Sequence, residues 1–526
     1  MQTKKSLYES THYFSIPNTD MHSLSCAWER GETSMKLSTI QQSFFEAILM
    51  PFKAIRLRYV PLLMIYFSYG ATAFSAIAHD FLVKKDLGLS AVEYMELSFW
   101  LMIPWSIKMI FGQIVDSFTL LGSNRKIYVY IGAVLMSFGI AMVVAIAGKY
   151  EIFSGYDRDS LYMLAMIITT VGIVMQDVVA DTMSTEVTDK NLNESERKVE
   201  LATIQVLARL ALALGGFAVS GLGGWLASIY SYETIFKLSL FIPILSIIGV
   251  SFVQLNSVPP SPLNKKILFG GIGFALFIII MGVNEIPYSQ EIIFVISLAV
   301  VLYMLREVVG DLDSDTIHHI KMAMIVIFVY RAMPSVGPAL QWWEIDVLQF
   351  DEAFFGVLAQ IGATLGIIGM WISGKFIVDK SISSVLIAMT IIYTILSLPL
   401  LGMYYDLHTL LGVDAKTVAV IDTALASPFD YIAGVIMLTL VAIYAPEGKK
   451  ATWFALMASF MNIALGAAKL LTKYLNEIFV VTREIKEKGV IITHADYSQL
   501  GMLMWVVIIV GFVVPIVTIW KFNPDK

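Results

Sequence analysis

Long apolar segments recur along almost the whole chain, and they restrict its fold more than any other feature. After residue 58, runs of about 20 predominantly apolar residues follow one another, and each is long enough to cross about 30 Å of hydrocarbon as an α-helix. Hydrophobic residues make up 57% of the 526 residues and charged residues 15%, whereas soluble domains carry about 25% charged residues. The sequence therefore predicts an all-α polytopic membrane protein.

We predict about fourteen spans, grouped as six, two and six. Two six-helix bundles with an inserted helix pair are the organisation of a two-bundle transporter, because many transporters are built from repeated helical units. The spans lie near 59–80, 94–112, 127–147, 161–182, 203–228, 235–254, 267–283, 291–305, 320–340, 353–372, 384–404, 417–443, 452–473 and 499–521. The predicted domains are a cytoplasmic tail (1–58), an N-terminal bundle (59–255), a linker with the helix pair (256–319) and a C-terminal bundle (320–522).

The polar N-terminal tail contains no apolar run of the kind found in a cleaved signal peptide. Within it, residues 39–58 place Phe44, Ile48 and Phe52 on one helical face and end in basic residues, which predicts an interfacial helix leading into the first span. An ordinary polar tail is the alternative. The single cysteine, Cys26, excludes an internal disulfide.

The positions of Lys and Arg near the span ends predict the orientation in the membrane. If the N-terminus is inside, the cytoplasmic side receives most of these residues, including Arg125 and Lys126. The outer side keeps Lys84, Lys85, Arg483, Lys486 and Lys488. We expect both termini in the cytoplasm and residence in the plasma (inner) membrane.

A short charged motif occurs at matching places in the two predicted bundles. After the second span Gly112 and Asp116 precede Arg125 and Lys126, and the equivalent place in the second bundle reads GKFIVDK, residues 374–380. Charge pairs in such tight inner loops can hold the bundles in one conformation, so we predict a gating loop. The alternative is that these residue types are simply common in cytoplasmic turns.

Two carboxylates lie inside the fourth span. Asp177 and Asp181 are four residues apart and therefore share a helical face. A carboxylate at this depth costs a few kcal/mol unless it faces water or a partner, and we expect Arg209 of the next span to be that partner. Because two nearby carboxylates disfavour each other's ionisation, one of them is a candidate proton carrier. The alternatives are a fixed charge lock without a coupling role, or an Asp181 already at the cytoplasmic interface.

The second bundle carries its own polar groups within predicted spans. Asp422 and Asp430 flank Pro428, Arg331 precedes a Pro- and Gly-rich interruption, and Asn462 lies in the thirteenth span. Interrupted helices commonly line substrate sites, so we treat these residues as candidates for substrate binding or coupling. The run GGFAVSGLGG, residues 215–224, predicts close helix packing through small residues.

Several kinds of chemistry have no motif in this sequence. There is no GxxxxGK[ST] loop for ATP hydrolysis, no HExxH or Cys/His spacing for a metal, and no GxSxG nucleophile elbow. We therefore expect no enzyme, no metal, no cofactor and no nucleic-acid partner, and energy from a gradient. The remaining partners are the lipid bilayer, a small solute, and a proton or other coupling ion.

Several segments together resemble the folate-biopterin transporter family of the major facilitator superfamily. They are DLGLS (86–90), PWSIK (104–108) with Gly112 and Asp116, RKIYVYIGA (125–133), QDVVADTM (176–183) with Glu186, Arg209, Asp422, Asp430, PEGKKATWFAL (446–456) and Asn462. The family has an acidic residue just before the Ala-Thr pair, whereas this chain has Lys450.

The resemblance implies uptake of a folate or pterin with protons, by alternating access around a central site. Arg209 and Arg331 are then the counter-charges for an anionic substrate. Two other readings remain open. One is a muropeptide or acyl-carrier permease of the same superfamily, and the other is a non-transporting assembly factor or sensor. A membrane enzyme that uses the Asp177 and Asp181 pair is conceivable, but the two-bundle plan is against it.

Overall fold

The computed structural model describes residues 54–123, 125–189, 191–251, 265–284, 286–377, 381–446, 450–487 and 490–523. Most of the predicted interfacial helix and Cys26 lie outside the described residues, and so do Asp379 and Lys380 of the second gating-loop motif.

The described chain is almost entirely helical, and its first half runs from residue 57 to residue 251. Short 3₁₀ helices, η1 (Leu57–Tyr59), η2 (Thr72–Ser75) and η4 (Glu151–Phe153), and a short π-helix, η3 (Val83–Leu87), accompany the α-helices. The helices are α4 (Val60–Ala71), α5 (Ala76–Leu82), α6 (Ala91–Ser106), α7 (Lys108–Ser117), α8 (Lys126–Ala147), α9 (Arg158–Glu186), α10 (Glu194–Ala227), α11 (Tyr232–Ser239) and α12 (Phe241–Ser251).

Two helices connect the first half to the second, which runs from residue 314 to residue 521. The connecting pair is α13 (Lys265–Val283) and α14 (Ser289–Val309). The second half contains α15 (Ser314–Arg331), α16 (Pro338–Asp346), α17 (Glu352–Ile377), α18 (Ile382–Leu396), α19 (Leu398–Tyr404), α20 (Leu407–Leu410), α21 (Ala415–Ile443), α22 (Lys450–Ile478), β1 (Ile485–Glu487), β2 (Val490–Thr493) and α23 (Leu500–Lys521). The two strands form an antiparallel hairpin.

Helices lie at all fourteen positions predicted as spans, and twelve of them, counted over the described residues, are long and apolar enough to cross a membrane. The other two are α13, whose apolar part Phe269–Gly282 is short, and α15, which ends at Arg331. The twelve spans and their hydrophobic surface identify an integral multi-pass membrane protein. The count of fourteen spans stays a prediction.

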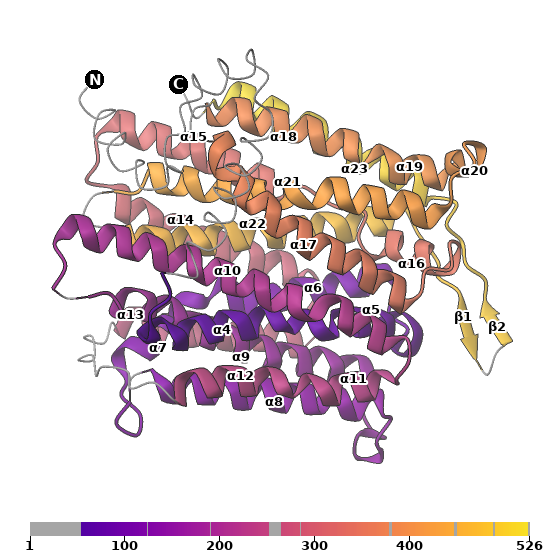
Figure 1. The fold of residues 1–526 in the computed structure, drawn as a ribbon, viewed down its shortest axis with the longest axis horizontal. Coiled ribbons are helices and arrows are strands. Elements are labelled where there is room, and N and C mark those ends of the chain that lie inside the picture. The colour runs from indigo at the N-terminus through magenta and orange to yellow at the C-terminus, as the bar shows by residue number, and fades with distance from the viewer. Residues whose placement is uncertain are drawn as a thin grey trace, which may run out of the picture.

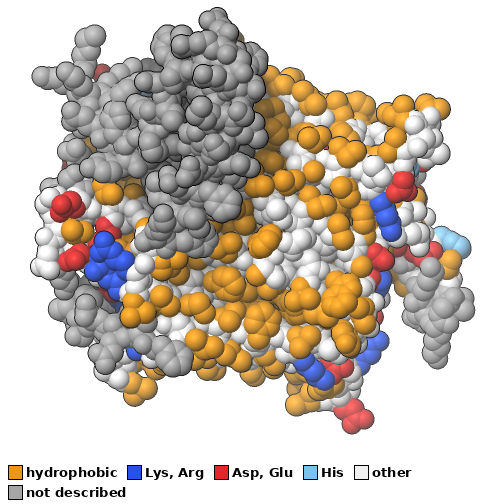
Figure 2. All heavy atoms as spheres, viewed as in Figure 1, with side chains coloured by type: hydrophobic (Ala, Val, Ile, Leu, Met, Phe, Trp, Pro, Cys, Tyr) orange, Lys and Arg blue, Asp and Glu red, His pale blue; other side chains and the backbone are white. Residues whose placement is uncertain are grey.

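The helices lie side by side along the long axis of the molecule (Figure 1). Hydrophobic side chains cover the middle of the visible surface and charged ones gather near its two ends, as a bilayer requires (Figure 2). Separate buried cores hold each half together, and α13 and α14 pack against α6 and α22.

The glycine-rich run 215–224 packs closely, as its composition predicts. A Cβ atom added at Gly215 or Gly223 would collide with the backbone of Phe67 or Phe74, and at Gly224 it would meet Gly356 of α17 at 2.5 Å. Small residues therefore allow α10 to contact the α4 region on one side and the second half on the other.

Two interruptions in the helices have clear causes. After Pro104, α6 ends at Ser106, and α7 begins at Lys108, with Ile107 outside helical geometry between them. The interruption predicted after Arg331 is present, because α15 ends there and α16 begins at Pro338. By contrast, α21 continues through Pro428.

Candidate functional site

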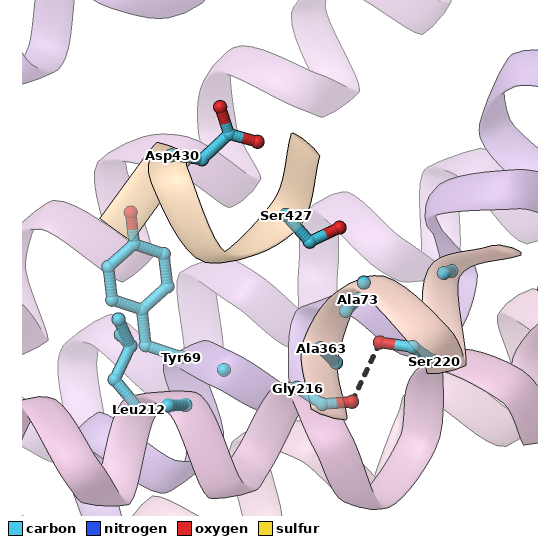
Figure 3. A pocket seen from close by; sticks show the side chains of 12 residues that line it. Tyr69, Ala73, Leu212, Gly216, Ser220, Ala363, Ser427 and Asp430 are labelled. Carbon is cyan, nitrogen blue, oxygen red and sulfur yellow. Dashed lines mark hydrogen bonds between the residues drawn. The ribbon is translucent and has the colours of Figure 1, made fainter. Parts of the chain in front are cut away.

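An open cavity of about 460 Å³ lies between the two halves, lined by α4 and α10 on one side and α17 and α21 on the other. Most of its lining consists of glycine and alanine, and its polar lining residues are Tyr69, Ser220, Ser427 and Asp430 (Figure 3). Its volume lies within the range of about 300–1,000 Å³ that is usual for small-molecule sites. A central solute site between the halves is therefore sterically possible.

One lysine bridges the two carboxylates of the fourth span. Lys108 Nζ lies 2.5 Å from Asp177 Oδ2 and 2.5 Å from Asp181 Oδ2. The break between α6 and α7 places Lys108 at the start of α7, which packs against α9. The predicted pairing of both aspartates with Arg209 is therefore wrong, because α7 brings a closer cation to them.

Arg209 stays near this cluster without an ion pair to any described residue. It is exposed, and it lies close enough to act electrostatically on Tyr66, Tyr69 and Asp177. Arg209 therefore acts on Asp177 from a longer range, whereas Lys108 makes the ion pairs with the two carboxylates.

Aromatic residues connect the charge cluster to the cavity. The Tyr66 hydroxyl donates a hydrogen bond to Asp181, while Tyr69 lines the cavity and stacks on Trp105 with ring centroids 5.5 Å apart. Asn462 Nδ2 of α22 donates to the Trp105 carbonyl at 3.4 Å. Asn462 therefore contacts the first half just before the break that positions Lys108. Sequence reasoning missed Tyr66 and Tyr69, because tyrosines in apolar helices are usually core residues.

The remaining predicted residues of the second half are not gathered into one cluster. Arg331 Nε donates to the Met461 carbonyl at 3.3 Å, and Asp430 lies at the cavity. Asp422 lies near Glu344, and its Oδ1 is buried without a hydrogen-bond partner among the described residues. Within that part of the chain neither Asp422 nor Asp430 takes part in an ion pair.

The predicted gating loop forms its charge pairs within the first half. Arg125 Nη2 lies 3.0 Å from Asp116 and 2.5 Å from Glu186, and Arg125 Nη1 donates to the Val115 carbonyl at 2.8 Å. At Lys126 the backbone N–H donates to Ser123, and Gly112 lies near Val178. These contacts tie α7, α8 and α9 together, and whether the loop gates transport stays a prediction.

Ion pairs between the two halves gather at one end of the molecule, where α16, α20 and the hairpin lie (right in Figure 1). The buried Lys84 pairs with Asp346, Lys85 Nζ lies 2.9 Å from Glu352, and Lys473 Nζ lies 2.9 Å from Glu96. Because Lys84 is buried in its pair and is not a free surface charge, it need not follow the usual bias of loops.

Arg483 reinforces the same end from the segment before the hairpin. It donates to the carbonyls of Lys84 at 2.6 Å and Leu89 at 3.1 Å, and also to that of Gly88. Burial lowers the pKa of the Arg483 guanidinium, and three carbonyl acceptors compensate for its desolvation. Asp346 also accepts from the Tyr497 hydroxyl at 2.6 Å, and burial together with this bond raises the pKa of Tyr497. This end is therefore closed by polar contacts between the halves.

Comparison with known proteins agrees with this architecture. The chain is 24% identical over 403 residues to the folate-biopterin transporter of Synechocystis sp., covering 77% of this chain and 71% of the relative. It is 21% identical over 405 residues to folate transporter 1 of Plasmodium falciparum, covering 76% and 69%. A crystal structure of a POT family transporter in complex with a thioalcohol-conjugated peptide has the same fold, with a TM-score of 0.63, 14% identity, and coverage of 89% of this chain and 95% of that one.

The model of the BT1 family matches residues 70–522, which includes most of both halves and the site residues described above except Tyr66 and Tyr69. The relatives are transporters and not enzymes, and the fold is of the major facilitator type. The chain therefore belongs to the BT1 family of membrane transporters.

Proposed function

We propose that this protein is a secondary active transporter of a folate or pterin, coupled to protons and working by alternating access. The observation that carries the proposal is the central cavity between the two halves. The ion pairs described above that join the halves all lie at one end of the molecule. Separation of these pairs, with closure of the opposite end, would expose the same cavity to the other side. The names of the relatives support the substrate class.

In this proposal the N-terminal and C-terminal bundles, residues 59–255 and 320–522, rock against each other. Both termini lie in the cytoplasm, and the closed end faces outward. The structure is then closed to the outside, with the basic ends of the spans on the cytoplasmic side.

The charge cluster supplies a coupling site. Asp181 is the more accessible of the two carboxylates, because 44% of its side chain is exposed, against 9% for Asp177. A proton that binds Asp181 would release Lys108 to Asp177 alone, and this changes the contact between α7 and α9. Arg209 and Arg331 lie on opposite halves, where each could bind a carboxylate of the substrate.

Uptake into liposomes tests this proposal. Purified protein should accumulate labelled folate or biopterin inside vesicles under an inward proton gradient, and unlabelled muropeptide or acetyl-CoA should not compete. Asp177→Asn should abolish accumulation while sparing exchange of internal for external substrate, because Lys108 then has no carboxylate to pair with when Asp181 binds the proton. Asp157→Asn, which keeps the N-cap of the same helix, is the matched control.

Two results would contradict the proposal separately. Full gradient-driven accumulation by correctly inserted Asp177→Asn protein would remove the coupling role of the cluster. Absence of pterin and folate uptake by the wild-type protein, with uptake of another solute, would overturn the substrate class.

A further inference from the structure

Asp80, a carboxylate at the closed end, makes no ion pair with any described residue. Asp80, on α5, accepts a hydrogen bond from the Tyr94 hydroxyl of α6 at 2.9 Å and one from Gln341 Nε2 of α16 at 3.3 Å. Both donors are neutral, and Gln341 belongs to the other half of the molecule. Asp80 therefore lies in the seam between the halves at the end that is closed.

Lys84, the lysine four residues after Asp80, pairs with a different carboxylate. Lys84 follows Asp80 by four residues in the same helical span, a spacing at which an acid and a base readily pair. In this structure Lys84 instead reaches across to Asp346, with exposed fractions of 3% and 8% for the two side chains. When the halves separate at this end Lys84 loses Asp346, and Asp80, four residues earlier in its own span, has the helical spacing that allows the two to pair.

Several other titratable groups at this end already have partners. On α5 itself, His79 Nδ1 lies 2.9 Å from the hydroxyl of Tyr162 on α9. The charged groups pair with one another: Lys84 with Asp346, Lys85 with Glu352, and Arg483 with backbone carbonyls. Glu344 and Asp86 at this end also make no ion pair with a described residue, but neither has a lysine four residues away in its own helical segment, as Asp80 has in Lys84.

We propose that Asp80 is a further coupling residue, which binds a proton when this end closes. In the open state Lys84 pairs with Asp80 and both are charged. As this end closes, Lys84 transfers to Asp346, and a proton from the outside water that still reaches this end binds a carboxylate oxygen of Asp80. The protonated carboxyl donates to the Tyr94 hydroxyl, whose hydrogen can rotate away, while Gln341 donates to the other oxygen.

The protonation of Asp80 on transfer of Lys84 follows from the cost of charge inside a membrane protein. A half-buried carboxylate that has lost its cation is expensive, and protonation removes that cost at once. Closure of this end is thereby linked to the uptake of one proton. The inference rests on the alternating access of the proposed function, but it makes no use of the substrate's identity.

Measurement of the closed end on purified protein, without substrate, tests the inference. Spin labels at Tyr156→Cys of the first half and Leu410→Cys of the second, both highly exposed, report the distance across this end in a Cys26→Ala background. Between about pH 8 and pH 5, the range in which enclosed carboxylates often titrate, acidification should favour the short distance. One linked proton changes the closed-to-open ratio by at most about tenfold per pH unit.

Asp80→Asn should be closed at every pH, because an amide needs no counter-charge and keeps the shape of the group. Asp86→Asn, six residues further along the same span, is the matched control and should keep the wild-type pH response. A wild-type ratio that does not change with pH would overturn the inference, and so would an Asp80→Asn protein that responds to pH like the wild type. Because no folate or pterin is present, failure of the proposed substrate class leaves this result unaffected.

Discussion

The bridge between Lys108 and its two aspartates permits a quantitative prediction. Lys108→Met removes the cation but keeps a long side chain in its place. The effect should arise mainly at Asp177, whose side chain is 9% exposed, because water can solvate Asp181, whose side chain is 44% exposed. Loss of one partner of a buried pair costs about 3–5 kcal/mol. Since Lys108 itself is 21% exposed, we expect about 3 kcal/mol, at the low end of that range.

Double-mutant cycles separate the two contacts. The free energy of unfolding is measured by denaturant titration in detergent for Lys108→Met, for Asp177→Asn and for the double variant. The coupling energy between Lys108 and Asp177 should be about 2–3 kcal/mol. The matched cycle with Asp181→Asn should give about 1 kcal/mol or less, as exposed pairs do. Equal coupling energies in the two cycles would refute the reasoning that burial decides the strength of each contact.

Two further predictions concern the contacts that hold the halves together. Arg483→Gln should open the closed end, because it removes donors to the carbonyls of Lys84 and Leu89. Chemical labelling of a cysteine introduced at the buried Ala339 should then become faster. Arg158→Gln is the control and should leave the labelling rate unchanged, because the carbonyls that Arg158 contacts belong to the first half. Gly223→Ala should destabilise the protein by about 1–3 kcal/mol, because its Cβ would meet the Phe74 carbonyl. Gly511→Ala has open space and should be neutral in the same thermal unfolding assay, and equal effects of the two substitutions would contradict the packing argument.

The sequence predicts the helices and the importance of the fourth span well, since both depend on local patterns. Apolar length identifies each span, and the spacing of Asp177 and Asp181 places them on one helical face. The glycine run 215–224 is also predictable, because small residues have one common use in packed membrane helices.

The charge partners could not be predicted in the same way. Lys108 is 69 residues from Asp177, and only the packing of α7 against α9 brings them together, whereas Arg209 is the cation on the next span. Lys84 and Asp346 are 262 residues apart and belong to different halves. In the sequence Lys84 is indistinguishable from a loop lysine. Pairing across the molecule depends on the orientation of whole helices, which no single segment encodes.

The hairpin of β1 and β2 extends from the closed end, directly after the segment that carries Arg483. A protein that binds this hairpin can act on the transporter without entering its cavity. If binding draws the segment away, Arg483 loses its contacts with the first half and the closed end opens more easily. If binding fixes the segment in place, the transporter stays shut. An antibody raised against residues 485–493 would therefore be an inhibitor or an activator according to the position in which it holds the hairpin.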